Sequence, residues 1–131
     1  MTRRVLSREQ RGDVESCLAT WSEFSRGGMG GFVSAQWSAV RSGDFSSSVP
    51  VPPVVDAVEF AVSLMAKHDQ PARELIVWLW LERNVGLTKI ERAGTLRVHV
   101  STYERWEDRA YVQIWNAVVD CGIIAGKKIA A

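Results

Sequence analysis

Side chains suited to binding a charged polymer gather between residues 89 and 109. Thr102, Arg105 and Arg109 recur at intervals of three and four, so they share one face if this stretch is helical. Just before that face lie four more polar side chains: Lys89, Arg92, Arg97 and His99. Basic groups contact phosphate oxygens, and arginine and hydroxyl side chains also read base edges in DNA. We therefore expect DNA contacts from both sets, with the second set on backbone phosphates.

Acidic side chains in the same stretch disfavour DNA binding. Glu104, Glu107 and Asp108 would repel DNA if they faced it, and a solvated helix with ordinary ion pairs is the alternative interpretation. Exposure on a helix explains these carboxyl groups better than acid–base catalysis does. Neither His68 nor His99 has a partner at metal-ligand spacing. We expect no enzymatic activity, no metal and no cofactor.

Two helix starts in quick succession must position these side chains. Thr88 with Glu91, and Ser101 with Glu104, have the spacing of a capping box. The first start is followed by the apolar stripe Ile90, Ala93 and Leu96. The second is followed by the longer stripe Tyr103, Trp106, Ala110, Ile114 and Val118. A short helix, a turn and a longer helix make a helix-turn-helix, whose second helix enters the major groove of DNA.

The packing positions of that motif are mostly filled by suitable residues. Ala93 supplies the small residue where the two helices touch. Apolar residues stand at the end of the first helix, in the turn and on the second helix: Leu96, Val98, Tyr103 and Trp106. Arg92 stands where an apolar residue is usual, and Arg97 replaces the usual glycine of the turn. We expect Ile90 to take over the missing contact.

Apolar periodicity predicts three further helices, at residues 7–24, at 54–67 and from Asp69 to just before Asn84. In the last of these, Leu75–Leu81 is apolar on every side, which is typical of a helix buried on several faces. A buried strand is the alternative for so short a run. The fold class that follows is all-α, a helical bundle containing a helix-turn-helix.

Glycine, serine and proline mark the connection between the first helix and the rest. Four glycines lie within residues 27–31, and residues 42–53 are rich in serine and proline, with a short helical turn expected around Trp37 between them. No phosphate-loop pattern accompanies the glycines. We therefore divide the chain into an N-terminal part, residues 1–53, and a helix-turn-helix part, residues 54–131.

The composition is that of one globular unit. The chain has 131 residues, 47% of them hydrophobic, and its net charge of +1 excludes a polycation that coats nucleic acid by bulk charge. Two separate cysteines indicate buried free thiols rather than a zinc site. The sequence shows no signal peptide and no apolar run long enough for a membrane span. These features predict a soluble protein of the cytoplasm.

Six tryptophans exceed what a core of this size needs. We expect Trp106 in the core, together with Trp78 or Trp80. Trp21 and Trp37 lie in the N-terminal part, where a core is hardest to complete. Both are candidate contacts to a protein partner, and packing within the chain is the equal alternative.

Residues 54–124 resemble the antitermination Q proteins of lambdoid-type bacteriophages, in the branch that lacks zinc. The resemblance rests on the Val85-Gly-Leu-Thr88 entry and on Val100-Ser-Thr-Tyr-Glu-Arg-Trp106. The stretch Val14-Glu-Ser-Cys-Leu-Ala-Thr-Trp21 is also similar to the start of those proteins. A helix-turn-helix of the type found in sigma region 4 would share the same core.

This resemblance implies a specific role in the host bacterial cytoplasm. A Q protein binds double-stranded DNA near the phage late promoter, loads onto a paused RNA polymerase that carries its sigma factor, and suppresses pausing and termination. A pair of protomers on the DNA is one arrangement. The resemblance also makes Ser101, Thr102 and Arg105 the base-reading positions, and gives Arg97 and His99 to the backbone. Two alternatives stay open: a repressor or activator that remains on DNA, and a protein-only adaptor or inhibitor of RNA polymerase.

Overall fold

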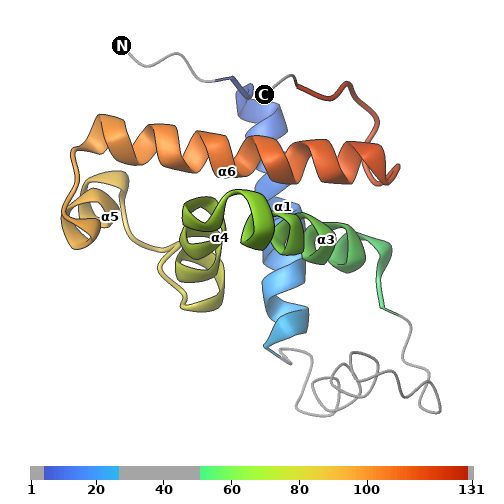
Figure 1. Cartoon of the computed structure of the whole chain (residues 1–131), viewed down its shortest axis with the longest axis horizontal. Helices are drawn as coiled ribbons and strands as arrows, with labels where there is room; N and C mark the ends of the chain where they lie inside the picture. Colours follow the sequence, from blue (N-terminus) through green and yellow to red (C-terminus); the bar gives the residue numbers. More distant parts are fainter. Residues whose placement is uncertain (1–4, 27–50, 130–131) are drawn as a thin grey trace.

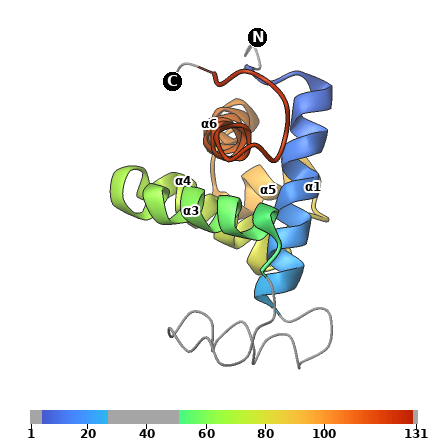
Figure 2. The same cartoon turned by 90° about the vertical axis from the view of Figure 1, so that its right-hand side faces the viewer.

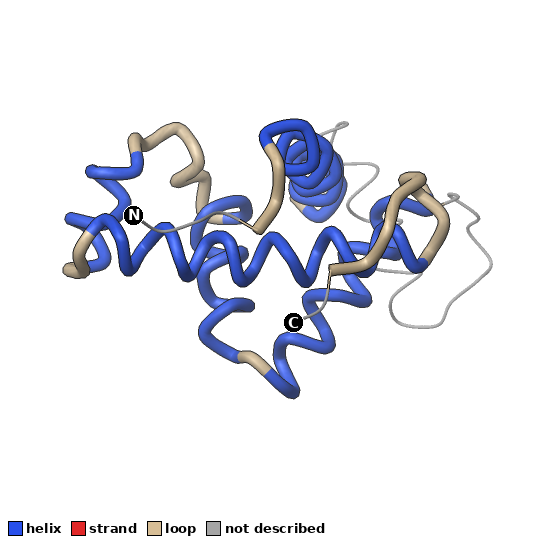
Figure 3. The backbone as a smooth tube through the Cα atoms, turned by 90° about the horizontal axis from the view of Figure 1, so that it is seen from above, coloured by secondary structure: helices blue, strands red, loops and turns tan. Residues whose placement is uncertain are grey.

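The longest helix, α6 (Val100–Asp120), lies at the centre of the structure because four other helices pack against it. The computed structural model describes residues 5–26 and 51–129. Its other elements are α1 (Arg8–Ser25), α3 (Pro53–His68), α4 (Gln70–Ile76), the π-helical segment η1 (Val77–Leu81) and α5 (Lys89–Leu96). Figure 3 shows helices joined by loops, with no strand in the described ranges. The predicted all-α class is therefore confirmed.

The helices cross one another rather than running in parallel. In Figure 1, α1 passes across both α6 and α3, while α5 lies beside the N-terminal end of α6. Figure 2 looks along α6 and places α1 on one side of it, with α3 and α4 beneath. Helix α1 contacts α3, η1 and α6. The first helix therefore packs on the same body as the helices that follow residue 53.

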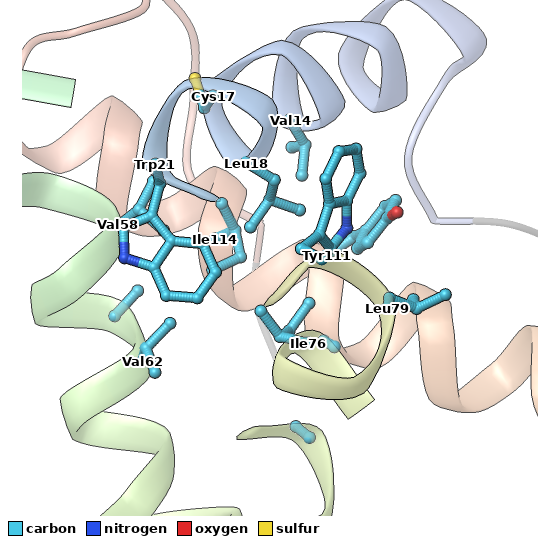
Figure 4. Close-up of a cluster of buried hydrophobic side chains, with 14 of the residues drawn as sticks. Val14, Cys17, Leu18, Trp21, Val58, Val62, Ile76, Leu79, Tyr111 and Ile114 are labelled. Atoms are coloured by element: carbon cyan, nitrogen blue, oxygen red, sulfur yellow. The ribbon is translucent and has the colours of Figure 1, made fainter. Parts of the chain in front are cut away.

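One apolar cluster runs through these helices. Figure 4 shows Val14, Leu18 and Trp21 of α1 gathered with side chains from α3, η1 and α6. Each of the three is at most 2% exposed. Burying a side chain of this kind contributes about 1.5–3 kcal/mol. Because α1 supplies so much of the shared core, it is a structural part of the fold.

Capping boxes begin two of the helices, α1 and α5. In the first, the backbone N–H of Gln10 donates to Ser7 Oγ at 3.1 Å, and the N–H of Ser7 donates to Gln10 Oε1 at 2.8 Å. Thr88 and Glu91 form the same pair of bonds at the start of α5. The box predicted at Ser101 is wrong, because α6 begins earlier. Its N-cap is His99, whose Nδ1 accepts from the N–H of Ser101 at 3.2 Å.

Helix α4 continues without a break into η1, where the hydrogen-bond spacing widens. The N–H of Glu82 donates to Val77 O at 3.0 Å, and the N–H of Asn84 donates to Leu79 O at 2.9 Å. Both bonds span five residues, as in a π-helix. The side chain of Asn84 also caps the carbonyl of Trp78 at 2.8 Å. The predicted end of this helix before Asn84 is confirmed, and the run from Leu75 is helical rather than a strand.

After α6 the chain turns back along that helix. Trp115 Nε1 donates to Lys127 O at 2.9 Å, and the side chain of Asn116 makes two bonds with the backbone of Ile129. Gly126 lies so close to the indole that an added Cβ would sit 2.8 Å from Trp115 Cζ2. This position therefore requires glycine.

The cysteines differ in their surroundings. Cys17 is buried in α1, where burial and then the nearby charge of Asp13 raise the pKa of its thiol. Cys121 is exposed just after the end of α6, so the prediction of a second buried thiol is wrong. No described helix is both long enough and apolar enough to cross a membrane. The expectations for residues 27–50, including the helical turn at Trp37, lie outside the described residues.

Candidate nucleic-acid interface

A three-residue connection, Arg97–His99, joins α5 to α6. Arg97 adopts a left-handed conformation with φ of +58°, the region in which glycine is favoured. The N–H of Val98 donates to Ala93 O at 3.0 Å, and the N–H of Arg97 donates to Gly94 O at 3.2 Å. These two bonds form a Schellman motif. Arg97 therefore takes the backbone shape that the missing glycine would have supplied.

Four of the predicted site residues come together at the start of α6. Ser101 and Arg105 are exposed and Thr102 is half-buried. Arg105 Nη2 lies 3.5 Å from Thr102 Oγ1, and His99 Nδ1 lies 2.9 Å from Ser101 Oγ. Within residues 5–26 and 51–129, Arg105 makes no ion pair that would neutralise it. This end of α6 presents hydroxyl groups and an unneutralised guanidinium to solvent.

Arg109 follows on the same helix but has a protein partner. Its Nε donates to Asp69 Oδ2 at 2.7 Å, and the same oxygen accepts from Gln113 Nε2 at 2.7 Å. The side chain of Arg109 is still 69% exposed. Asp69 weakens its positive charge, so Arg109 is a poorer phosphate ligand than Arg105.

Lys89 and Arg92 lie away from this group. Both line a cavity of about 580 Å³ between α1 and α5, together with Arg8 and Arg11 of α1. Arg92 is 8% exposed, and it donates to Glu107 Oε2 at 2.9 Å and to the carbonyl of Val85. The prediction that Arg92 meets a backbone phosphate is wrong, because its guanidinium is held inside the protein.

The acidic partner in this arrangement is Glu107, which we expected to be exposed and which is only 2% exposed. Its carboxylate accepts from Tyr103 Oη at 2.6 Å, from Arg92 and from Arg11 of α1. Arg11 also donates to Asp108 Oδ1 at 3.3 Å. We call these five residues the Glu107 cluster. A sequence signal existed, because Glu107 follows Tyr103 by four residues on the buried stripe of α6.

Burial and charge perturb the ionisation of this cluster. Burial, and then the hydrogen bond and charge of Glu107, raise the pKa of Tyr103 far above its ordinary value. Burial alone would lower the pKa of Arg92, but the Tyr103 hydroxyl and the Glu107 carboxylate raise it. Tyr111, whose ring lies under the Arg11 guanidinium at 4.9 Å, also has a raised pKa, chiefly because it is buried. The cluster is a structural connection among α1, α5 and α6.

Trp106 and Ile90 lie where we did not expect them, whereas Trp21 takes one of its two expected places. Trp21 is 2% exposed and its Nε1 donates to Glu59 Oε2 at 2.7 Å, so it is a core residue and not a partner contact. Trp106 is 43% exposed, so its predicted place in the core is wrong. Ile90 is 73% exposed and replaces no core contact, because Arg92 fills that space instead. Trp80 is buried as expected, and Trp37 lies outside the described residues.

The structure and the comparisons leave the nucleic-acid role of this region as a prediction. Among the described residues, no three His, Cys, Asp or Glu side chains are grouped so that they could hold a metal ion. Comparison with protein-family models, curated proteins and solved structures finds nothing that matches this chain.

Proposed function

We propose that this chain binds double-stranded DNA through the N-terminal half of α6. The observation that supports the proposal is the group formed by the exposed Ser101 and Arg105 with the half-buried Thr102, directly after the three-residue turn from α5. A recognition helix meets base edges with residues at its N-terminal end. Arg97 and His99, both exposed in the turn, stand where the phosphate backbone would pass.

The Glu107 cluster also supports the proposal. Acidic residues on α6 disfavour DNA binding where they face the DNA, because carboxylates repel phosphates. Glu107 is buried between two guanidinium groups, and Asp108 is paired with Arg11. Their charges are therefore compensated on the side of α6 that faces α1 and α5.

We further propose that the DNA-bound protein acts as a phage late-gene antiterminator that loads onto bacterial RNA polymerase. This step rests on the sequence resemblance at residues 85–88 and 100–106. The second candidate function is a repressor or activator that stays on DNA, which the same exposed face of α6 would serve.

DNA binding is tested with a duplex selected from a randomised pool. We expect Arg105→Gln to weaken binding about tenfold and to lower the slope of log K against log salt by about one. Lys67→Gln, which removes an exposed cation on α3, is the control and should change neither quantity. If Arg105→Gln leaves affinity intact, α6 is not the recognition helix.

A purified transcription assay separates the two candidate functions. We expect read-through of a downstream terminator only when the template carries the selected site near its promoter. A change in initiation alone would favour the repressor or activator. Polymerase binding with no salt-dependent affinity for DNA would favour a protein-only adaptor.

A further inference from the structure

An apolar groove of about 380 Å³ opens between α4–η1, the end of α5 and the first half of α6. Its lining includes Pro71, Glu74, Trp78, Glu82, Leu96 and Trp106. In Figure 1 these elements lie on the side of the molecule where α4 and α5 approach the same half of α6. The groove is separate from the Glu107 cluster and uses none of the side chains proposed to meet DNA.

Two indole rings make the groove unusual for a free surface. Trp106 is 43% exposed and Trp78 is half-buried, although the same helices bury Trp80 and Trp115. Tryptophan is costly to leave in water and is enriched among the residues that dominate protein interfaces. Each ring keeps part of its surface open to solvent in the described part of the chain, so that part is available to a ligand.

The rim of the groove carries negative charge. Glu74 and Glu82 are both exposed, and neither forms an ion pair with a described residue. They are eight residues apart along the α4–η1 helix, which is about two turns. A polyanion such as DNA is repelled from this rim, whereas lysine and arginine side chains are attracted to it.

We propose that this groove docks a short amphipathic helix of a partner protein. A large apolar side chain of the partner lies between Trp78 and Trp106. Two basic side chains, about two helical turns apart on the partner, pair with Glu74 and Glu82. The inference does not rest on the proposed DNA binding, because it concerns a different face and a ligand of opposite charge.

The probe is a synthetic helical peptide of about fifteen residues, with one central phenylalanine and two lysines about two turns apart. Its binding to the full chain is followed through the indole N–H signals of the ¹⁵N-labelled protein. We expect the signals of Trp78 and Trp106 to shift while that of Trp21 does not. A peptide with glutamate in place of both lysines should bind at least about tenfold more weakly.

Charge reversal on the protein provides the decisive comparison. We expect the double variant Glu74→Lys and Glu82→Lys to prefer the glutamate peptide over the lysine peptide. Phe60→Ser, which removes an exposed apolar residue on α3, is the control and should leave the original preference unchanged. DNA affinity measured in parallel reports separately on the proposed function.

Several results would overturn the proposal. These are no shift at either tryptophan, equal binding of the two peptides, or an unchanged preference in the double variant. Self-association of the chain that is abolished by Trp106→Ser would instead assign the groove to a second copy.

Discussion

The carboxylate of Glu107 connects three helices through side chains alone. It accepts from Arg11 of α1, Arg92 of α5 and Tyr103 of its own helix, and it is almost completely buried. Removing one partner from such a buried group leaves the others with uncompensated charge. The loss of this one carboxylate charge therefore affects three helices together.

We predict that Glu107→Gln lowers the free energy of unfolding by about 3 kcal/mol, because buried Arg92 loses its counter-charge and Arg11 keeps only that of Asp108. Urea denaturation followed by circular dichroism measures the change. Glu23→Gln, an exposed position on α1, is the control and should shift stability by less than about 0.5 kcal/mol. A loss below about 1 kcal/mol for Glu107→Gln would contradict the role of the cluster.

The chain has two tyrosines, and both are fully buried with raised pKa values. The folded state therefore holds the neutral phenols, so its stability is complete below about pH 10 and falls as the pH rises above that value. We predict that tyrosinate absorbance appears only together with loss of helical circular dichroism. Ionisation near pH 10 in a chain that is still folded would show that these phenols are accessible to solvent.

At the scale of elements, the end of α5 has a left-handed backbone conformation at a residue that is not glycine. The Schellman bonds require a left-handed residue at position 97, and the chain supplies arginine. A non-glycine residue in this conformation costs about 1 kcal/mol or more. The strain is tolerated because Ala93, Leu96 and Val98 pack against the core on either side.

We predict that Arg97→Gly raises the free energy of unfolding by about 1 kcal/mol, because glycine adopts this conformation without strain. Thermal denaturation measures the gain. Arg97→Ala removes the same side chain but keeps the Cβ, so it should give no comparable gain. Equal effects of the two substitutions would mean that the side chain, and not the backbone, sets the stability.

Most of the helices could be predicted from local sequence signals, namely capping residues and apolar periodicity. The first helix was expected at 7–24 and is Arg8–Ser25, because Ser7 and Gln10 cap it through neighbouring residues. The start of α6 was misplaced because a histidine side chain can also accept a capping bond. The π-helical spacing of η1, a segment that continues α4 and contacts α1, has no local sequence signature.

The sequence predicted only those residues of the candidate site that lie at or beside the start of α6. His99, Ser101, Thr102 and Arg105 share a helix start, so periodicity groups them. Arg92 was assigned to the wrong side because its partners, the side chains of Tyr103 and Glu107 and the carbonyl of Val85, come together only in the folded structure. Arg11 itself lies 96 residues from Glu107, and no local pattern connects them.

At the scale of the whole molecule, α1 completes the core that α3, η1 and α6 begin. Val14, Leu18 and Trp21 are buried against those helices, and Arg11 neutralises Glu107. Without α1, large apolar faces on three elements would meet water. The predicted boundary at residue 53 therefore separates two parts of the sequence whose helices share one core.

We predict that a fragment beginning at residue 51 does not unfold cooperatively, because it lacks the apolar side chains of α1. Thermal circular dichroism and the binding of a hydrophobic dye measure this. Adding a synthetic peptide of residues 5–26 should restore a cooperative transition. A fragment that melts sharply by itself would show that residues 54–131 are an independent domain.

The long separation between Arg11 and Glu107 has a consequence for how the protein is made. Among the described helices α1 leaves the ribosome before the others and α6 after them, so α1 lacks part of the surface that it finally covers until α6 has been made. Its apolar residues become fully buried, and Arg11 gains its partner Glu107, only when α6 emerges. The shared core therefore closes only after α6 has been made, and α1 is exposed to chaperones and proteases until then.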